Sequence, residues 1–102
     1  MKECCRKYLT EQFGDDVEVV DAIYAEYVSS IAAKMAEADA ALAAGAWDAL
    51  DRAAHTVKGN ALAAGDQQMA NAAIALRNAA KLQERDQAER IIADLRALEE
   101  QL

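Results

Sequence analysis

Apolar residues recur every three or four positions along almost the whole chain, the spacing that places side chains on one face of an α-helix. The first such stretch covers residues 4–13 and is followed by Gly14, a residue type that commonly ends a helix. Asp15 then stands where an N-cap is expected, and Glu18 follows three residues later, the spacing of a capping box. The pattern predicts a short first helix and a much longer second helix over residues 16–44.

Two further glycines and an aspartate divide the middle of the chain. Gly45 ends the second helix, and a third predicted helix covers residues 46–64. Gly65 is expected to end the third helix, and Asp66 is expected to be the N-cap of the next one. A fourth helix is predicted over residues 67–83, with its Met, Leu and several alanine side chains facing inward.

A last apolar seam predicts a fifth helix. Asp86 and Glu89 form a second capping box before it, and the seam reaches Leu102. Because the four long amphipathic helices are joined by short turns, neighbouring helices are expected to run antiparallel. The predicted fold is all-α: an antiparallel up-down-up-down four-helix bundle with a short N-terminal cap helix, forming one domain over residues 1–102.

The composition agrees with this fold. Alanine accounts for 26 of the 102 residues, proline is absent, and aromatic residues make up only 5%. Strong helix formers therefore dominate, and residues that favour strands are scarce. Seams rich in alanine let helices approach one another closely.

The charge of the chain excludes several classes of function. A net charge of −7 repels phosphate backbones and anionic lipids, and the 11 basic residues are scattered, so neither a nucleic acid nor a membrane is expected as a partner. No apolar run approaches the roughly 20 residues of a membrane span, and the first residues lack the apolar core of a secretory signal. We expect a cytoplasmic protein, and a monomer because the bundle uses the one apolar face of each long helix.

The two cysteines do not form a recognisable site. Cys4 and Cys5 are adjacent, so a bond between them would be strained and would link no distant segments. Reduced thiols are the simpler expectation, with one packed at a helix end and the other exposed. The only histidine lies 50 positions further on, and metal sites need more ligands than this. We expect neither a metal nor a cofactor.

The third helix carries that histidine away from its apolar stripe. With 100° per residue, the stripe falls within an arc of about 80°, and His55 lies about 130° from its centre. The imidazole is therefore expected to point to solvent. The stripe consists of Trp47, Leu50, Ala54, Val57 and Ala61.

The neighbours of His55 on this face are unusual. Gly59 follows one turn later, where a helical glycine costs about 1 kcal/mol relative to the alanine that this chain uses freely. Its missing side chain would let another molecule approach the ring. Lys58, on the other flank, can bring its ammonium group to an anion held on the imidazole. Leu62 and Ala63 continue the exposed face and give it the apolar margin of a docking surface.

These residue types favour phosphoryl transfer. A neutral imidazole has a free ring nitrogen that can attack an electrophilic phosphorus. Lys58 would offset charge on the phosphoryl oxygens, and Gly59 would clear the approach. Asp51, one turn before His55, is expected to accept a hydrogen bond from the ring and to belong to the docking surface.

The residues around the histidine read Ala54-His55-Thr56-Val57-Lys58-Gly59-Asn60, and Gly65 follows. This motif resembles the H-x-x-K-G signature of histidine-containing phosphotransfer (HPt) domains, which are four-helix bundles that relay phosphoryl groups in two-component signalling. The resemblance extends over about residues 10–102. It implies that His55 is phosphorylated, that Lys58 is the anion partner and that Gly59 provides clearance.

The resemblance also implies a polar side chain from the next helix near the ring. Arg77 is the main candidate, and Lys81, one turn later, is the second. Asn60 faces away from His55 on the helical wheel and receives no role. No ATP-binding motif is present, so the implied activity is that of a phosphoryl carrier, not of an enzyme. The implied partners are response-regulator receiver domains and a histidine kinase, either hybrid or not, with any Mg²⁺ held mostly by the partner.

Two other interpretations remain open. One is a non-phosphorylated adaptor that docks a kinase or a receiver domain. The other is an enzyme that uses His55 as a general base, although enzymes prefer concave sites, and a helix face is convex. A di-metal bundle would need Glu-x-x-His pairs from two helices, and the chain has one histidine.

Overall fold

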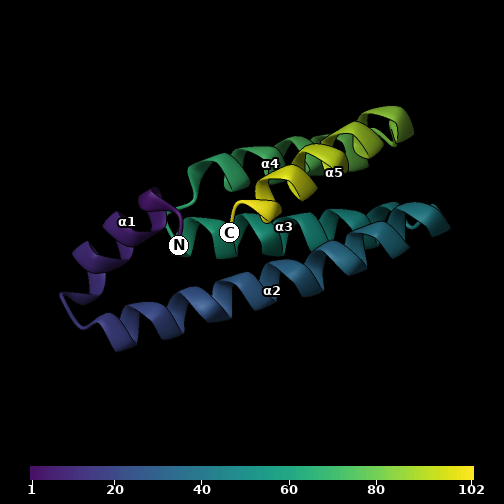
Figure 1. Cartoon of the computed structure of the whole chain (residues 1–102). Coiled ribbons are helices and arrows are strands. Elements are labelled where there is room, and N and C mark those ends of the chain that lie inside the picture. The colour runs from purple at the N-terminus through teal and green to yellow at the C-terminus, as the bar shows by residue number, and fades with distance from the viewer.

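The computed structural model describes residues 1–102 and consists of five α-helices, which Figure 1 shows in chain order from purple to yellow. Each predicted helix is present, and the ends lie within about two residues of those expected. The helices are α1 (Glu3–Phe13), α2 (Val17–Ala44), α3 (Trp47–Ala63), α4 (Gln67–Lys81) and α5 (Arg85–Glu100).

Helices α2 to α5 form an antiparallel bundle in which each helix reverses the direction of the one before it (Figure 1). The most extensive contact joins α3 and α4, and α2 packs against both α3 and α5. The molecule measures 44 × 19 × 18 Å, and α1 lies at the end of the bundle where α3 turns into α4 (Figure 1). None of the helices has the length and apolar character that a membrane crossing requires. The predicted fold class is confirmed.

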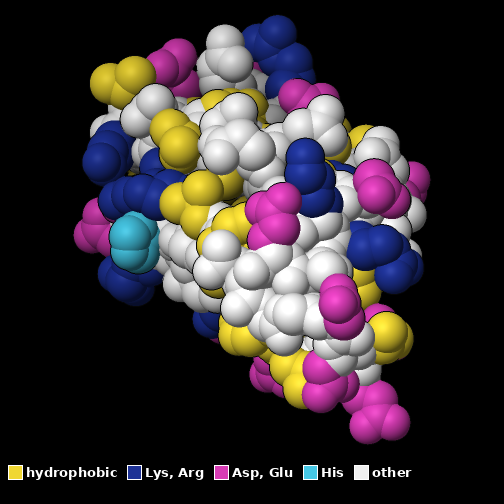
Figure 2. All heavy atoms as spheres, turned by 90° about the vertical axis from the view of Figure 1, so that its left-hand side faces the viewer, with side chains coloured by type: hydrophobic (Ala, Val, Ile, Leu, Met, Phe, Trp, Pro, Cys, Tyr) yellow, Lys and Arg dark blue, Asp and Glu magenta, His cyan; other side chains and the backbone are white.

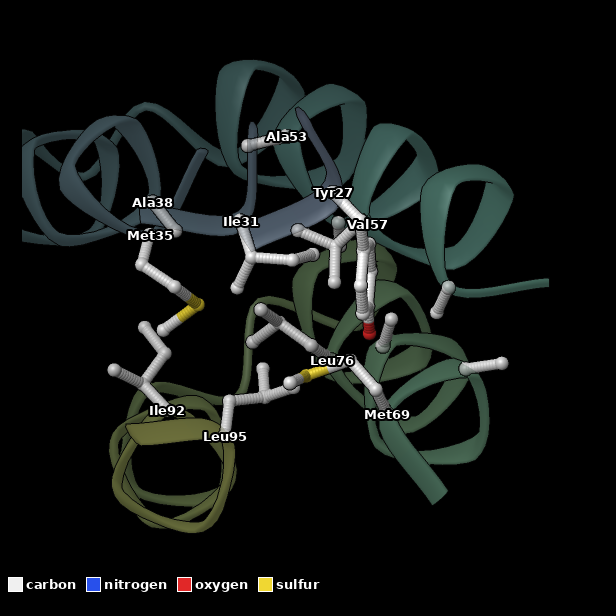
Figure 3. Close-up of a cluster of buried hydrophobic side chains, with 14 of the residues drawn as sticks. Tyr27, Ile31, Met35, Ala38, Ala53, Val57, Met69, Leu76, Ile92 and Leu95 are labelled. Atoms are coloured by element: carbon white, nitrogen blue, oxygen red, sulfur yellow. The ribbon is translucent and has the colours of Figure 1, made fainter. Parts of the chain in front are cut away.

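The core consists of 25 buried apolar residues, and 11 of them are alanines. These small side chains line much of the contact between α3 and α4 and allow the two helices to approach closely. Larger side chains fill the middle of the bundle, as Figure 3 shows for Ile31 and Met35 of α2, Val57 of α3, Leu76 of α4 and Leu95 of α5. Burial of each large side chain contributes on the order of 1.5–3 kcal/mol to folding.

The predicted N-cap of α2 is wrong by one residue. Asp16, not Asp15, accepts a hydrogen bond from the backbone nitrogen of Val19, at 3.3 Å. Gly14 adopts a positive φ of 76° after α1, and the turn that follows includes Asp15 before the helix begins. Glu18 consequently lies one position too early to complete a capping box.

The predicted capping box of Asp86 and Glu89 is also wrong. Helix α5 begins earlier, at Arg85, whose guanidinium donates a hydrogen bond to the backbone carbonyl of Leu42 at 2.9 Å. The same guanidinium lies over the ring of Trp47, 5.6 Å from its centroid. These contacts with the end of α2 and the start of α3 hold Arg85 at the start of α5, so Asp86 lies within the first turn.

A buried carboxylate holds α1 against the end of the bundle. Asp66 caps α4 as predicted, accepting a hydrogen bond from the backbone nitrogen of Met69 at 3.3 Å. Its carboxylate also accepts a hydrogen bond from the Tyr27 hydroxyl at 2.8 Å and pairs with the Lys2 ammonium at 2.9 Å. Burial lowers the pKa of Lys2, but the hydrogen bond and the negative charge of Asp66 outweigh it and raise that pKa. Both oxygens of this carboxylate therefore accept hydrogen bonds, although the side chain has no access to solvent.

Gly65 allows α1 to approach the turn between α3 and α4. Its φ is +75°, and a Cβ at this position would lie 2.3 Å from the Cβ of Tyr8. Cys5 and Leu9 of α1 are completely buried beside this turn. Cys4 is exposed, which confirms the expected division between the two thiols. Burial chiefly raises the pKa of Cys5 to about 12, so its thiol stays protonated at neutral pH.

Candidate functional site

The two faces of α3 are divided as the helical wheel predicts. His55 is exposed to solvent. Four of the five residues assigned to the apolar stripe are at most 1% exposed, which confirms the stripe, while Trp47 at the start of the helix is only partly buried. The fully buried members are Leu50, Ala54, Val57 and Ala61.

The positions beside His55 differ in what surrounds them. Lys58 is partly buried, whereas Gly59 is exposed, and a Cβ built on it would meet no atom within 4 Å. The fold therefore does not require a glycine there, and the open space is available to a second molecule. Asn60 is directed away from this face, as predicted, because its amide donates a hydrogen bond to the Ser30 hydroxyl on α2.

Asp51 does not make the expected hydrogen bond to His55. Its carboxylate instead accepts a hydrogen bond from Nε of Arg77 at 2.9 Å, which joins α3 to α4. The close packing of these two helices brings the guanidinium within reach, and a carboxylate binds a cationic guanidinium more strongly than an uncharged imidazole N–H. The structure therefore places Arg77 about one helical turn from the level of His55, while Lys81 lies one turn farther away.

Basic side chains surround the imidazole. Arg52 and Lys58 lie three residues before and after His55 on the same helix, and Arg77 approaches from α4. In Figure 2 the cyan imidazole lies between dark-blue Lys and Arg side chains. Because the chain as a whole carries a net charge of −7, this region is a local reversal of sign. Such a cluster attracts anions such as phosphoryl groups.

The apolar margin of this face extends across two helices. Leu62 is 44% exposed and Ala63 is also exposed, as predicted. Ile74 of α4 is 42% exposed and was not among the residues selected from the sequence. It precedes Arg77 by one turn, which in antiparallel helices brings it to about the level of His55. The sequence did indicate that Ile74 is exposed, because this residue falls outside the stripe of α4 that faces inward.

The surface around His55 is not enclosed. The imidazole lines none of the five main surface hollows, which have volumes of about 180 to 510 Å³. No three His, Cys, Asp or Glu side chains are grouped so that they would hold a metal ion. The arrangement is an accessible nucleophile with cations beside it, suited to a reaction completed in contact with another protein.

Comparison with known proteins extends this picture. The family model described as Hpt domain matches residues 22–102, which include most of α2 and all of α3, α4 and α5. Helix α1 lies outside the matched range. No curated protein and no solved structure matches the chain.

Proposed function

Because the chain belongs to the family of Hpt domains, the phosphoryl carriers of phosphorelays, we propose that it accepts a phosphoryl group on His55 and passes it to a response regulator. The donor would be the aspartyl phosphate of a receiver domain or a histidine kinase. The observation that carries this proposal is the exposed His55 with Lys58 on one flank and the bare backbone of Gly59 on the other.

The transfer step follows from the chemistry of the two groups. A ring nitrogen of neutral His55 contributes its lone pair to a new N–P bond, and the aspartyl oxygen leaves as carboxylate with the electron pair of the broken P–O bond. Transfer to a second receiver domain reverses these roles. The chain supplies no cofactor in this scheme, and the receiver's own carboxylates hold any Mg²⁺ that the reaction needs.

Two cations are proposed to act on the phosphoryl oxygens. Lys58 has no carboxylate partner, so its ammonium group is free to approach a phosphoryl group on His55. Arg77 is already paired with Asp51, which neutralises part of its field. We therefore assign the larger role to Lys58 and a smaller one to Arg77.

The remaining surface residues are assigned to docking. Leu62, Ala63 and Asp51 surround the imidazole and would contact the receiver domain, and Ile74 now joins them. We further propose that residues 1–102 form one domain, because one cluster of buried side chains includes residues from all five helices. We also propose that this domain acts as a monomer in the cytoplasm.

The test is phosphoryl transfer from a radiolabelled phosphorylated receiver domain. The chain should acquire a label that is labile in acid and stable in base, and His55→Gln should abolish it while leaving the thermal unfolding temperature unchanged. A label that persists in His55→Gln, or no transfer from any receiver domain of the source organism, would overturn the proposal. Binding of a receiver without transfer would then favour the adaptor.

A further inference from the structure

A groove between α2 and α3 lies beside the docking surface. Its volume is about 510 Å³, within the roughly 300–1,000 Å³ typical of binding sites. The buried side chains of Tyr27 and Ala64 form its floor, and the exposed Ala63 forms part of its rim. The hydrogen bond between Asn60 and Ser30 bridges the two helices and closes the groove at the end nearer His55.

Glu26 is the one charged side chain that lines this groove. It is exposed and takes part in no hydrogen bond or ion pair, and the residues one turn away on α2 are uncharged. The hydroxyl of Tyr27 is already committed to Asp66. The groove therefore offers largely apolar walls and one unpaired carboxylate.

The groove and the region around His55 have opposite charge. The imidazole lies among Arg52, Lys58 and Arg77, whereas no cation lines the groove. Ala63 at the rim follows His55 by eight residues, which corresponds to about 12 Å along the helix axis. A standard protein interface covers about 800 Å² on each partner. One protein domain placed over His55 therefore also reaches Ala63 at the rim of the groove.

Resting on the proposed function, we infer that the groove receives a lysine or arginine side chain of the receiver domain that exchanges phosphoryl groups with His55. The aliphatic stem of such a residue packs against the alanine walls while its cationic end pairs with Glu26. Two neighbouring regions of opposite sign also allow only one orientation of a partner with the complementary pattern. The groove thus serves as an orienting subsite for docking.

The test uses the full chain and the fastest donor among receiver domains phosphorylated with acetyl phosphate. The measured quantity is the second-order rate constant of transfer to His55. Glu26→Lys should lower it at least tenfold, and Glu26→Gln about threefold. Asp94→Lys makes the same change of charge at an exposed position of α5 and should stay within twofold of wild type.

A second pair of variants tests the apolar walls. Ala22→Trp fills the groove and should lower the rate constant at least tenfold, while Ala93→Trp, at an exposed alanine of α5, should leave it within twofold. If Ala22→Trp slows transfer and Glu26→Lys does not, the occupant has no cationic end and the inference is wrong. Unchanged rates in both groove variants also overturn it.

Phosphoramidate, a small-molecule phosphoryl donor, separates this inference from the proposed function. It needs no docking, so both groove variants should be labelled on His55 as fast as wild type, and their circular dichroism and thermal unfolding check that they are folded. If the wild-type chain takes no phosphoryl group from any receiver domain, the proposed function fails and this inference with it. If wild-type transfer is normal and the groove variants match it, only the groove assignment fails.

Discussion

The end of the bundle around Asp66 and the face around His55 belong to the same pair of helices, α3 and α4, yet their polar groups differ in burial and in hydrogen bonding. Asp66 is completely buried and accepts hydrogen bonds from Lys2, Tyr27 and the backbone of Met69. His55 is exposed, and the chain provides its ring with no hydrogen bond. A buried polar group must be satisfied by the fold, whereas an exposed one without partners is available to another molecule.

Two glycines repeat this contrast. Gly65 has a positive φ, and its hydrogen faces the side chain of Tyr8, so the fold itself requires a glycine. Gly59 lies in regular helix beside open space, and the fold would accept a larger residue. Comparing the effect of changes at the two regions on stability and on transfer therefore separates structural from functional requirements.

The largest effect on stability is expected from Asp66→Ala. The substitution removes an N-cap and leaves the buried Tyr27 hydroxyl without its acceptor, which together cost about 3 kcal/mol. Asp66→Asn keeps one oxygen acceptor, enough for one of these two donors, and should lose about half as much. Urea unfolding of both variants measures the difference. An Asp66→Ala chain as stable as wild type would show that the end of the bundle does not depend on this carboxylate.

Gly65→Ala should come next, with a loss of about 2–3 kcal/mol. The left-handed conformation penalises any Cβ, and the added methyl group would overlap Tyr8 unless α1 moves. The double variant Gly65→Ala with Tyr8→Gly tests the second cause, because removing the whole Tyr8 side chain, including the Cβ that lies nearest, should recover part of the loss. Thermal unfolding monitored by circular dichroism provides the values. If Gly65→Ala costs the same with and without the Tyr8 side chain, the left-handed backbone conformation alone accounts for the loss.

The sequence predicted most, but not all, of the features that depend on local spacing, since the caps of α2 and α5 differ from those expected. The five helices, the exposure of His55 and the cap at Asp66 all follow from periodicity and turn residues. The pairs Lys2–Asp66 and Asp51–Arg77 could not be predicted, because each joins residues that become neighbours only when the helices pack. The roles of Lys58 and Gly59 stay predictions, since they concern a second molecule.

Alkaline pH should lower the free energy of unfolding by about 1 kcal/mol per pH unit between pH 9 and 12, through groups at the Asp66 end of the bundle. The Cys5 thiol has a pKa near 12 in the folded chain, chiefly because it is buried, against an ordinary value of 9.0. The folded state therefore holds more protons than the unfolded state in this window, and stability falls as the pH rises. The raised pKa values of Tyr24 and Tyr27 act in the same direction.

The control for this pH dependence lies one residue away. Cys5→Ala should flatten the decline of unfolding free energy above pH 9, while Cys4→Ala, at an exposed thiol, should leave the slope as in wild type. The slopes are compared instead of the absolute values, because Cys5→Ala also removes a buried side chain. Identical slopes in the two variants would show that the buried thiol does not cause the decline.

On the His55 face, Lys58→Ala should slow phosphoryl transfer about tenfold, equivalent to about 1.4 kcal/mol in the barrier. The free energy of unfolding should change by less than about 0.5 kcal/mol, because Lys58 forms no ion pair. Arg77→Ala should slow transfer less, since Asp51 already pairs with its guanidinium. Stopped-flow or quench-flow transfer rates for the two variants decide the order, and a larger effect of Arg77→Ala would reverse the assigned roles.

The sharpest separation of stability from function is expected at Gly59. Gly59→Ala and Gly59→Gln should both raise the free energy of unfolding, by about 0.5–1 kcal/mol, because the helix gains a better helix former and nothing lies within 4 Å of the new Cβ. The longer glutamine side chain should nevertheless slow transfer from a receiver domain, since it occupies the space that the partner needs, while labelling by phosphoramidate continues. A Gly59→Gln chain that is both more stable and as fast as wild type would remove the functional reason for this glycine and leave Gly65 as the one glycine of the α3–α4 hairpin whose presence is explained.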